Sequence, residues 1–219
     1  METYDLTSEH DRLAIAAQVF VYPTQPHRRK HGPVGYTDYE SYRDWLRDDF
    51  SYRCVFSLVR ETWPQTRFHI DHLISQKERP DLVCDYDNLI LLESRLNLIK
   101  GKRRVPDPGK FALGECLMVH TGDERMGCIE ARNGNKTGEQ IIRVLRLDSE
   151  DATQMRRDWI GILRSVARTD EQLFRKFIGY PKPKDLTDLR AARVKNSRTG
   201  GLNQSAKHLS DNGELPAWY

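Results

Sequence analysis

Four side chains in the middle of the sequence are suited to the hydrolysis of a phosphodiester bond. Asp71 and His72 are neighbours, Asn88 follows after a spacer, and Asn97 stands nine residues beyond Asn88. Such hydrolysis needs a divalent cation that polarises the phosphate and a base that takes a proton from water. Asp71 offers a carboxylate oxygen and Asn97 an amide oxygen, which are ligands suited to Mg²⁺ or Mn²⁺. The residue types therefore predict metal-dependent cleavage of a nucleic acid.

A basic stripe overlaps the end of this segment. Residues 94–104 contain five basic and no acidic side chains. The basic residues are Arg95, Lys100, Lys102, Arg103 and Arg104. The whole chain carries a net charge of only +3, so the local cluster, and not the total charge, favours contact with phosphates. Phosphate contacts carry no sequence information, so recognition of a sequence would have to come from outside the stripe.

Two strands and a helix are expected to position these residues. Residues 68–74 alternate apolar and polar side chains, as a half-buried strand does, and residues 89–92 are a second strand candidate. From 94 the pattern becomes helical, and it ends at Gly101. Residues 75–88 form a long loop between the strands, and loops of that length inside a compact domain are usually functional.

The two neighbours Asp71 and His72 pose a geometric problem for this arrangement. Adjacent residues on a strand point to opposite sides, so a local twist or bulge is needed to bring both side chains to one site. Asn88, just before the second strand, could hold the His72 segment by hydrogen bonds. His69 faces the same way as Asp71, and it is expected either as an extra ligand or substrate contact or as a histidine that only packs.

The combined pattern resembles the signature of HNH (ββα-metal) endonucleases. That signature is Asp-His, a spacer, N-L-x-x-L, four residues, then His or Asn and x-x-K-G. The chain has Asp71-His72, then Asn88-Leu89-Ile90-Leu91-Leu92, then Asn97-Leu98-Ile99-Lys100-Gly101. The resemblance implies that Asp71 and Asn97 hold one divalent metal, Mg²⁺ or Mn²⁺, that His72 is the general base, and that Asn88 positions the His72 strand.

The chain departs from many HNH proteins at a second metal site. Many members hold a structural zinc with two C-x-x-C pairs, and the matching positions here are Cys54, Ser57, Glu93 and Leu96. One cysteine cannot complete a tetrahedral site, so we expect no structural zinc and a packed core in its place. The chain is similar to a bacterial HNH subgroup that lacks these cysteine pairs and ends near Gly-Glu-Leu-Pro-x-x-Tyr. Ser75 stands where the family usually has proline.

The resemblance implies an α+β fold, a ββα-metal core embedded in a mostly helical domain. The expected regions are an N-terminal helical extension, the HNH nuclease core, a helical and irregular support region, and a polar C-terminal tail: residues 1–50, 51–110, 111–180 and 181–219. We expect the aromatic end, Trp218-Tyr219, to dock back onto the domain.

The flanking elements are predicted from periodicity and capping residues. Helices are expected over residues 8–21, from the capping-box pattern at Thr37 to about Phe50, and, as one or two helices, over 149–178. Residues 52–56 are a short β-prone run. Residues 105–148, rich in glycine, are expected to be irregular connections with short strands.

The sequence also bears on where in the cell the protein is expected. No stretch approaches the roughly 20 apolar residues of a membrane span, and the first residues lack the pattern of a signal peptide. We therefore expect a cytoplasmic protein with no membrane partner. A reducing cytosol is compatible with free thiols at Cys54, Cys84, Cys116 and Cys128.

The resemblance implies a DNA endonuclease, and by analogy with the family a role in bacterial phage defence or restriction. One site cuts one strand, so a double-strand break would need a homodimer, a partner or two events. Because a free nuclease would attack its host genome, a partner protein is expected to gate or target cleavage. Two alternatives stay open: a gated or inactive HNH-like nucleic-acid-binding module within a multi-protein complex, and an RNA-directed nuclease. Retention of Asp71, His72 and Asn97 argues against a dead site.

Overall fold

The structure is a computed structural model that describes residues 4–122, 124–198 and 200–218. The chain divides into two compact units, each built from separated segments. The first unit comprises Met1–His27, Lys110–Gly179 and Trp218, and the second comprises Arg28–Gly109 and Tyr180–Ala217. Both mix helices with small antiparallel sheets. The division differs from the four expected regions, because residues 28–50 and the tail fold with residues 51–109.

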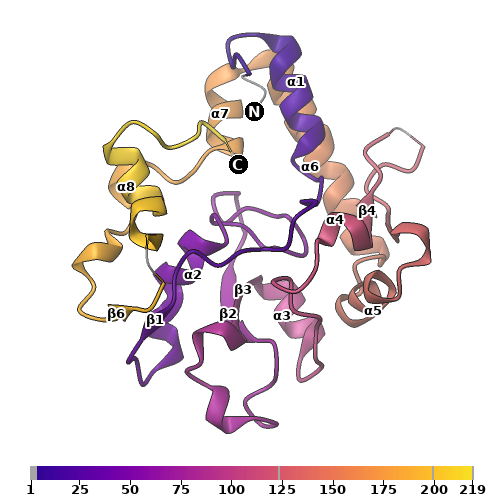
Figure 1. Cartoon of the computed structure of the whole chain (residues 1–219). Coiled ribbons are helices and arrows are strands. Elements are labelled where there is room, and N and C mark those ends of the chain that lie inside the picture. The colour runs from indigo at the N-terminus through magenta and orange to yellow at the C-terminus, as the bar shows by residue number, and fades with distance from the viewer. Residues whose placement is uncertain (1–3, 123, 199, 219) are drawn as a thin grey trace. The chain divides into compact units, whose positions relative to one another are not determined.

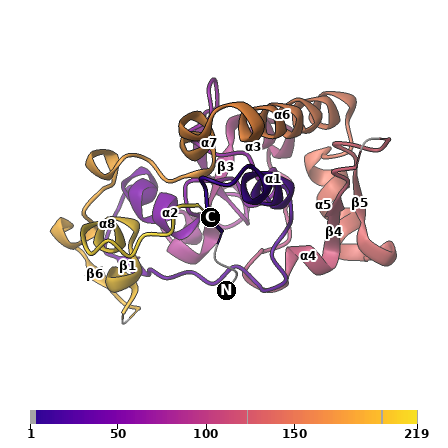
Figure 2. The same ribbon diagram turned by 90° about the horizontal axis from the view of Figure 1, so that it is seen from above.

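Helices dominate the first unit. α1 (Glu9–Gln18) packs along α6 (Glu150–Thr169), and α7 (Glu171–Ile178) also packs on α6 (Figures 1 and 2). Ser8 caps α1 and Ser149 caps α6 through side-chain oxygens that accept backbone N–H groups. The bounds of α1, α6 and α7 agree with the expected ranges. Asp170 caps α7.

The same unit contains two helices, α4 (Leu113–Cys116) and α5 (Lys136–Leu145), in the region where only irregular connections and short strands were expected. α4 leads into β4 (Leu117–Val119), which pairs antiparallel with β5 (Ile129–Ala131). α5 follows and contains Gly138. A Cβ at Gly138 would lie 2.1 Å from the carbonyl oxygen of Cys116, so the glycine permits close packing and does not mark a turn.

The second unit contains the predicted strand, loop, strand and helix. β2 (Phe68–His72) pairs antiparallel with β3 (Leu89–Glu93), and α3 (Ser94–Lys100) follows directly (Figure 1). Gly101 ends α3 with a positive φ of 54°, a conformation that glycine adopts readily. Two 3₁₀ turns, Pro80–Leu82 and Tyr86–Asn88, shape the loop between the strands.

The segments before β2 differ in detail from the expectation. The predicted helix from Thr37 is a 3₁₀ turn, Tyr39–Tyr42, capped by Asp38 and followed by α2 (Arg43–Asp49). The predicted strand at 52–56 is wrong, since these residues form turns with one isolated bridge between Arg53 and Arg60.

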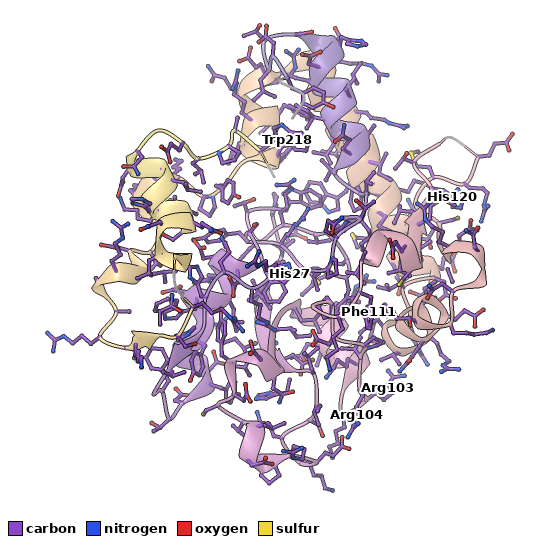
Figure 3. All side chains as sticks on the ribbon, viewed as in Figure 1. His27, Arg103, Arg104, Phe111, His120 and Trp218 are labelled. Atoms are coloured by element: carbon purple, nitrogen blue, oxygen red, sulfur yellow. The ribbon has the colours of Figure 1, made fainter. Side chains whose placement is uncertain are left out.

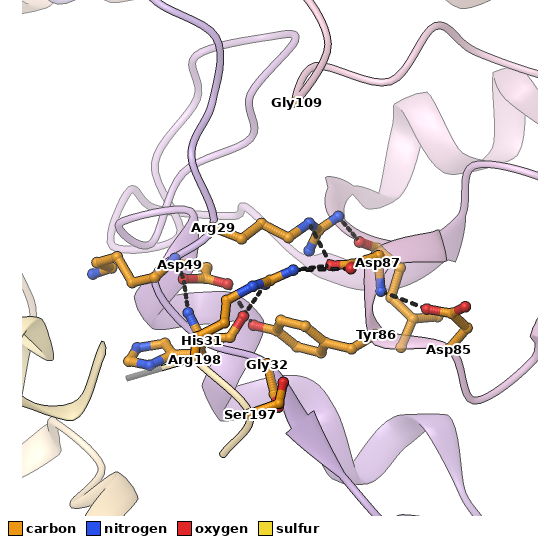
Figure 4. Close-up of polar contacts among 12 residues, drawn as sticks. Arg29, His31, Gly32, Asp49, Asp85, Tyr86, Asp87, Gly109, Ser197 and Arg198 are labelled. Carbon is orange, nitrogen blue, oxygen red and sulfur yellow. Dashed lines mark hydrogen bonds and ion pairs between the residues drawn. The ribbon is translucent and has the colours of Figure 1, made fainter. Parts of the chain in front are cut away.

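The C-terminal tail is an integral part of the second unit. β6 (Lys195–Asn196) pairs with β1 (Pro33–Val34), and the backbone N–H of Ala206, at the start of α8 (Ala206–Asp211), donates to Asp48 at 2.6 Å. Arg198 donates to the carbonyl of His31 and pairs with Asp87 at 2.6 Å (Figure 4). In the first unit the Trp218 ring meets Tyr4 edge-on at 5.7 Å, while Tyr219 lies outside the described residues.

A buried carboxylate joins the tail to the rest of that unit. Asp48 is 2 % exposed and binds His31 Nε2 at 2.9 Å and Lys30 Nζ at 2.6 Å. Burial alone would raise the pKa of Asp48, but the hydrogen bond to His31 and the charge of Lys30 hold it below its ordinary value. The second unit therefore depends on an ionised carboxylate in its interior.

Two general properties accompany this fold. Within the described residues, no helix has the length and apolar character needed to cross a membrane. The four cysteines are free thiols, with Cys54 and Cys116 buried.

Candidate active site

β2 divides the predicted catalytic residues between its two faces. The ladder pairs Asp71 with Ile90 and His72 with Leu89 in unbroken register. His69 is exposed and Asp71 half-buried on one face, whereas Ile70 and His72 are buried on the other. The expected bulge is not formed, so Asp71 and His72 leave the strand on opposite sides.

Lys100 of α3 holds the end of β2. Its Nζ lies 2.9 Å from Asp71 Oδ2 and donates to the carbonyl oxygen of His72 at 2.8 Å. Asp71 Oδ1 accepts the backbone N–H of His72 at 2.8 Å. The contact between Lys100 and Oδ2 is an ion pair without hydrogen-bond geometry, which leaves Oδ2 a buried acceptor with no hydrogen bond. Lys100, only 1 % exposed, therefore orders the strand end.

Asn97 lies one helical turn before Lys100 and reaches the other outward residue of β2. Its amide nitrogen is 3.4 Å from His69 Nδ1. Residues three apart on a helix lie on one face, so α3 presents Asn97 to His69 and Lys100 to Asp71. The outer face of β2 thus meets α3 at Asp71, His69 and Asn97. Among the described residues, Asp71 and Asn97 make no hydrogen bond with each other.

These three side chains are of types that bind a divalent cation. Asp71 Oδ2 is buried and faces the Lys100 ammonium at 2.9 Å, so a cation would have to displace Lys100 to bind it, and Asn97 can supply an amide oxygen. No group of three or more His, Cys, Asp and Glu residues suited to a metal occurs among the described residues. Mg²⁺ is usually held by one or two carboxylates and completed by waters and substrate phosphates, so a cation here would depend on the substrate for part of its coordination.

His72 has a defined orientation on the opposite face. The side chain is 4 % exposed, and its Nε2 lies 3.0 Å from the carbonyl oxygen of Val83. A carbonyl oxygen only accepts, so in the neutral ring Nε2 carries the proton and Nδ1 the lone pair. Nδ1 lies 3.3 Å from the amide nitrogen of Gln76, which is exposed, and the ring of Tyr39 meets the imidazole edge-on at 5.0 Å.

Asn88 ties the segment after His72 to the loop and to the start of β3. Its Oδ1 accepts the backbone N–H of Ile74 at 2.9 Å, and its Nδ2 donates to the carbonyls of Ile74 and Leu82 at 3.0 and 3.2 Å. Its own carbonyl accepts the N–H of Leu73 at 2.8 Å. These contacts are the ones that a residue positioning the His72 segment needs.

Most of the five basic residues in the stripe are buried or already bound to other groups of the chain. Arg95 Nε lies 3.5 Å from Glu93, Arg104 pairs with Glu78, and the Arg103 guanidinium binds carbonyls at the end of α3. The side chains of Arg103 and Arg104 can be followed in Figure 3. Lys100 is buried, so it does not belong to an exposed phosphate surface. Lys102 is exposed, and within the described part of the chain no carboxylate pairs with it.

The four positions expected to correspond to the zinc site of many HNH proteins are packed in this chain. Cys54, Ser57 and Leu96 are at most 2 % exposed, and Cys54 Sγ accepts the N–H of Ser57 at 3.5 Å. Burial raises the pKa of the Cys54 thiol, so it stays protonated. Glu93, at the fourth position, faces Arg95. Residues 54–59 form a turn in which the N–H of Cys54 donates to the carbonyl of Val59 at 2.9 Å. This turn is part of the core.

Sequence reasoning missed the groups that orient His72. Val83 acts through its backbone carbonyl, which has no signal in a sequence. Tyr39 belongs to a segment for which only a helix was expected, and Gln76 belongs to a loop in which no residue was singled out.

A scan against models of protein families and a search of curated proteins find no match to this chain. The functional argument therefore depends on its own residues and their geometry.

Proposed function

We propose that the chain is a metal-dependent endonuclease of the HNH class, with β2, β3 and α3 as its ββα-metal core. The observation that carries the proposal is the arrangement of His72. It is buried with Nε2 held by a backbone carbonyl and with its basic Nδ1 directed toward an exposed side chain. A histidine that only packs has no need of a single tautomer, whereas a general base does.

The chain's own residues account for the proton transfer and the orientation. His72 Nδ1 takes a proton from a water molecule as the water oxygen attacks phosphorus and the bond to the leaving sugar oxygen breaks. That oxygen then takes a proton from solvent. The Val83 carbonyl keeps the ring oriented as it becomes charged. A divalent cation held by Asp71 and Asn97 would polarise the phosphate and offset charge on the leaving oxygen. Because Asp71 and His72 leave β2 on opposite faces, the end of the strand has to twist before the two residues can act on one phosphate.

The proposed substrate is DNA, contacted through its phosphates by Lys102 and Arg103 beside α3. One site cuts one strand, so a double-strand break would require a second copy, a partner protein or a second event. A role in bacterial phage defence or restriction, in the cytoplasm, belongs to the same proposal.

A gated form of the same module is the second candidate, and two contacts favour it. The Gln76 amide donates to the nitrogen that must receive the proton, at 3.3 Å, so this side chain has to move before water can reach Nδ1. The Lys100 ammonium offsets the charge of Asp71 at 2.9 Å, which weakens attraction for a cation. Such a chain would bind nucleic acid and cut only after a partner rearranges the loop that contains Gln76.

The proposal is tested by cleavage of supercoiled plasmid with Mg²⁺, Mn²⁺ or EDTA, in parallel with a single-stranded RNA. Wild type and His208→Ala, a matched loss of a histidine elsewhere in the second unit, are expected to nick the plasmid with metal. His72→Ala is expected to bind DNA and leave it intact.

Other outcomes of this assay have defined meanings. Equal cleavage by His72→Ala would refute the assigned base. Cleavage of RNA alone would establish the RNA-directed alternative. Binding without cleavage by wild type, under every metal, would support the gated or inactive module.

A further inference from the structure

Three consecutive backbone carbonyls in the loop between β2 and β3 are each held by a different side chain. The carbonyl of Leu82 accepts from Asn88 Nδ2 at 3.2 Å, and that of Val83 from His72 Nε2 at 3.0 Å. The carbonyl of Cys84 accepts from the Tyr42 hydroxyl at 3.1 Å. We call residues 82–84 the carbonyl clamp.

Tyr42 is a well-fixed donor for this clamp. It lies in the 3₁₀ turn Tyr39–Tyr42, is 2 % exposed, and packs between the rings of Tyr36 and Tyr86, whose centroids lie 4.8 and 5.5 Å away. Burial raises the pKa of the Tyr42 hydroxyl, so the group keeps the proton that it donates.

We propose that Tyr42 is a positioning residue for His72 and acts through the carbonyl clamp. A peptide plane turns only about the two bonds at each flanking Cα. Holding the carbonyls of Leu82 and Cys84 fixes the two Cα atoms that flank the Val83 carbonyl, so this carbonyl can turn only about the line between them and stays directed at His72 Nε2. That direction selects the Nε2–H tautomer of His72 and leaves Nδ1 as the basic nitrogen.

The same 3₁₀ turn also contacts the imidazole itself. Tyr39, at its first position, meets the His72 ring edge-on at 5.0 Å. One short turn of the chain thus supports His72 directly through Tyr39 and indirectly through Tyr42. Residues 28–50 therefore belong to the site and are not an appendage of it.

The role of Tyr42 in catalysis rests on the proposed function, whereas its effect on the His72 ring does not. The experiment therefore has two readouts. The first is the ¹⁵N chemical shifts of the His72 imidazole, which report the tautomer in the absence of substrate. The second is kcat and KM for plasmid nicking.

The variant is Tyr42→Phe, which keeps the ring and removes the donor. The matched control is Tyr86→Phe, which removes a buried hydroxyl from the adjacent ring, bonded to Asp49 at 2.6 Å and not to the clamp. Tyr42→Phe is expected to give a mixture of His72 tautomers and to lower kcat about tenfold, the loss typical of residues that orient a functional histidine, with KM nearly unchanged. The control is expected to keep the wild-type tautomer and kcat.

Two results would overturn the inference. One is wild-type ¹⁵N shifts for His72 in Tyr42→Phe, and the other is an equal fall of kcat in both variants, which would indicate a structural role only. If wild type cuts nothing, the proposed nuclease fails and the tautomer readout still decides the positioning role. If Tyr42→Phe does not fold, 4-aminophenylalanine and 4-methylphenylalanine at this position form a pair of similar size, of which only the first donates. The wild-type tautomer is then expected with the amino group alone, and the same tautomer with both would refute the role of Tyr42.

Discussion

Replacing Lys100 with methionine tests whether this lysine orders the strand end or contacts phosphates. The Lys100 side chain is 1 % exposed, and its Nζ lies 2.9 Å from Asp71 Oδ2 and donates to the carbonyl of His72 at 2.8 Å. Methionine retains most of the aliphatic stem and its packing. The substitution therefore removes the charge and the donor while it leaves Asp71 in place.

The magnitude follows from the burial of the pair. Removing one partner of a buried ion pair costs about 3–5 kcal/mol, because the other charge is left without compensation. Asp71 is 12 % exposed at its side chain, so water can reach part of the carboxylate and the lower end applies. We expect Lys100→Met to reduce the free energy of unfolding by about 3 kcal/mol, which is more than a hundredfold in the ratio of folded to unfolded protein.

Urea denaturation of four proteins measures this effect. In the double variant Asp71→Asn/Lys100→Met both charges are gone, and we expect it to recover at least about 1.5 kcal/mol relative to Lys100→Met. Lys102→Met, a loss of the exposed neighbouring charge, is expected to stay within about 0.5 kcal/mol of wild type.

The reasoning would be refuted by either of two results. A loss below about 1 kcal/mol for Lys100→Met would mean that solvent screens the pair. A double variant no more stable than Lys100→Met would mean that the carboxylate left behind is not the cause. If Lys100→Met kept its stability and lost one unit of the salt slope of DNA binding, Lys100 would be a phosphate contact after all.

Three further predictions follow from other parts of the second unit. Folding lowers the pKa of Asp48, so its stabilisation is complete above the unfolded-state value of about 3.9 and is lost as the pH falls through the lower folded-state value. Asp48→Asn should therefore cost about 3 kcal/mol at pH 7 in urea denaturation, and a difference that does not shrink below about pH 4 contradicts this. His69→Ala should weaken Ni²⁺ binding, followed by isothermal titration calorimetry, about tenfold and Mg²⁺ binding little, because imidazole suits nickel whereas magnesium prefers oxygen ligands; equal losses would exclude His69 as a ligand. Lys102→Ala should reduce the salt dependence of DNA binding by about one unit, and an unchanged slope would place the phosphates elsewhere.

The elements around the site could be predicted from local patterns because their causes are local. Alternation over 68–74 and the apolar run at 89–92 gave two strands that the structure has at Phe68–His72 and Leu89–Glu93. Gly101 marked the end of α3. The expected helix starts at 8 and 149 fall at the serines that cap α1 and α6, and such a cap is local because it joins residues three apart.

Contacts between residues far apart in the chain could not be predicted from the sequence. The tail was expected to be polar and to dock only through its aromatic end, yet β6 completes a sheet with β1, and the N–H of Ala206 binds the carboxylate of Asp48, a residue 158 positions away in sequence. No pattern in the sequence around Asp48 indicates that this carboxylate is buried. Its burial depends on contacts from three segments, and no periodicity within one segment encodes them.

At the candidate site, too, some features could be predicted from the sequence and others depend on the fold. The residue types of Asp71, His72 and Asn97 were readable because a ligand and a base must be particular side chains. The tautomer of His72 was not readable, because a backbone carbonyl at Val83 selects it. Every residue type has such a carbonyl, so only the fold determines which one meets the imidazole. A substitution that redirects this carbonyl would therefore impair His72 while every residue of the signature remains in place.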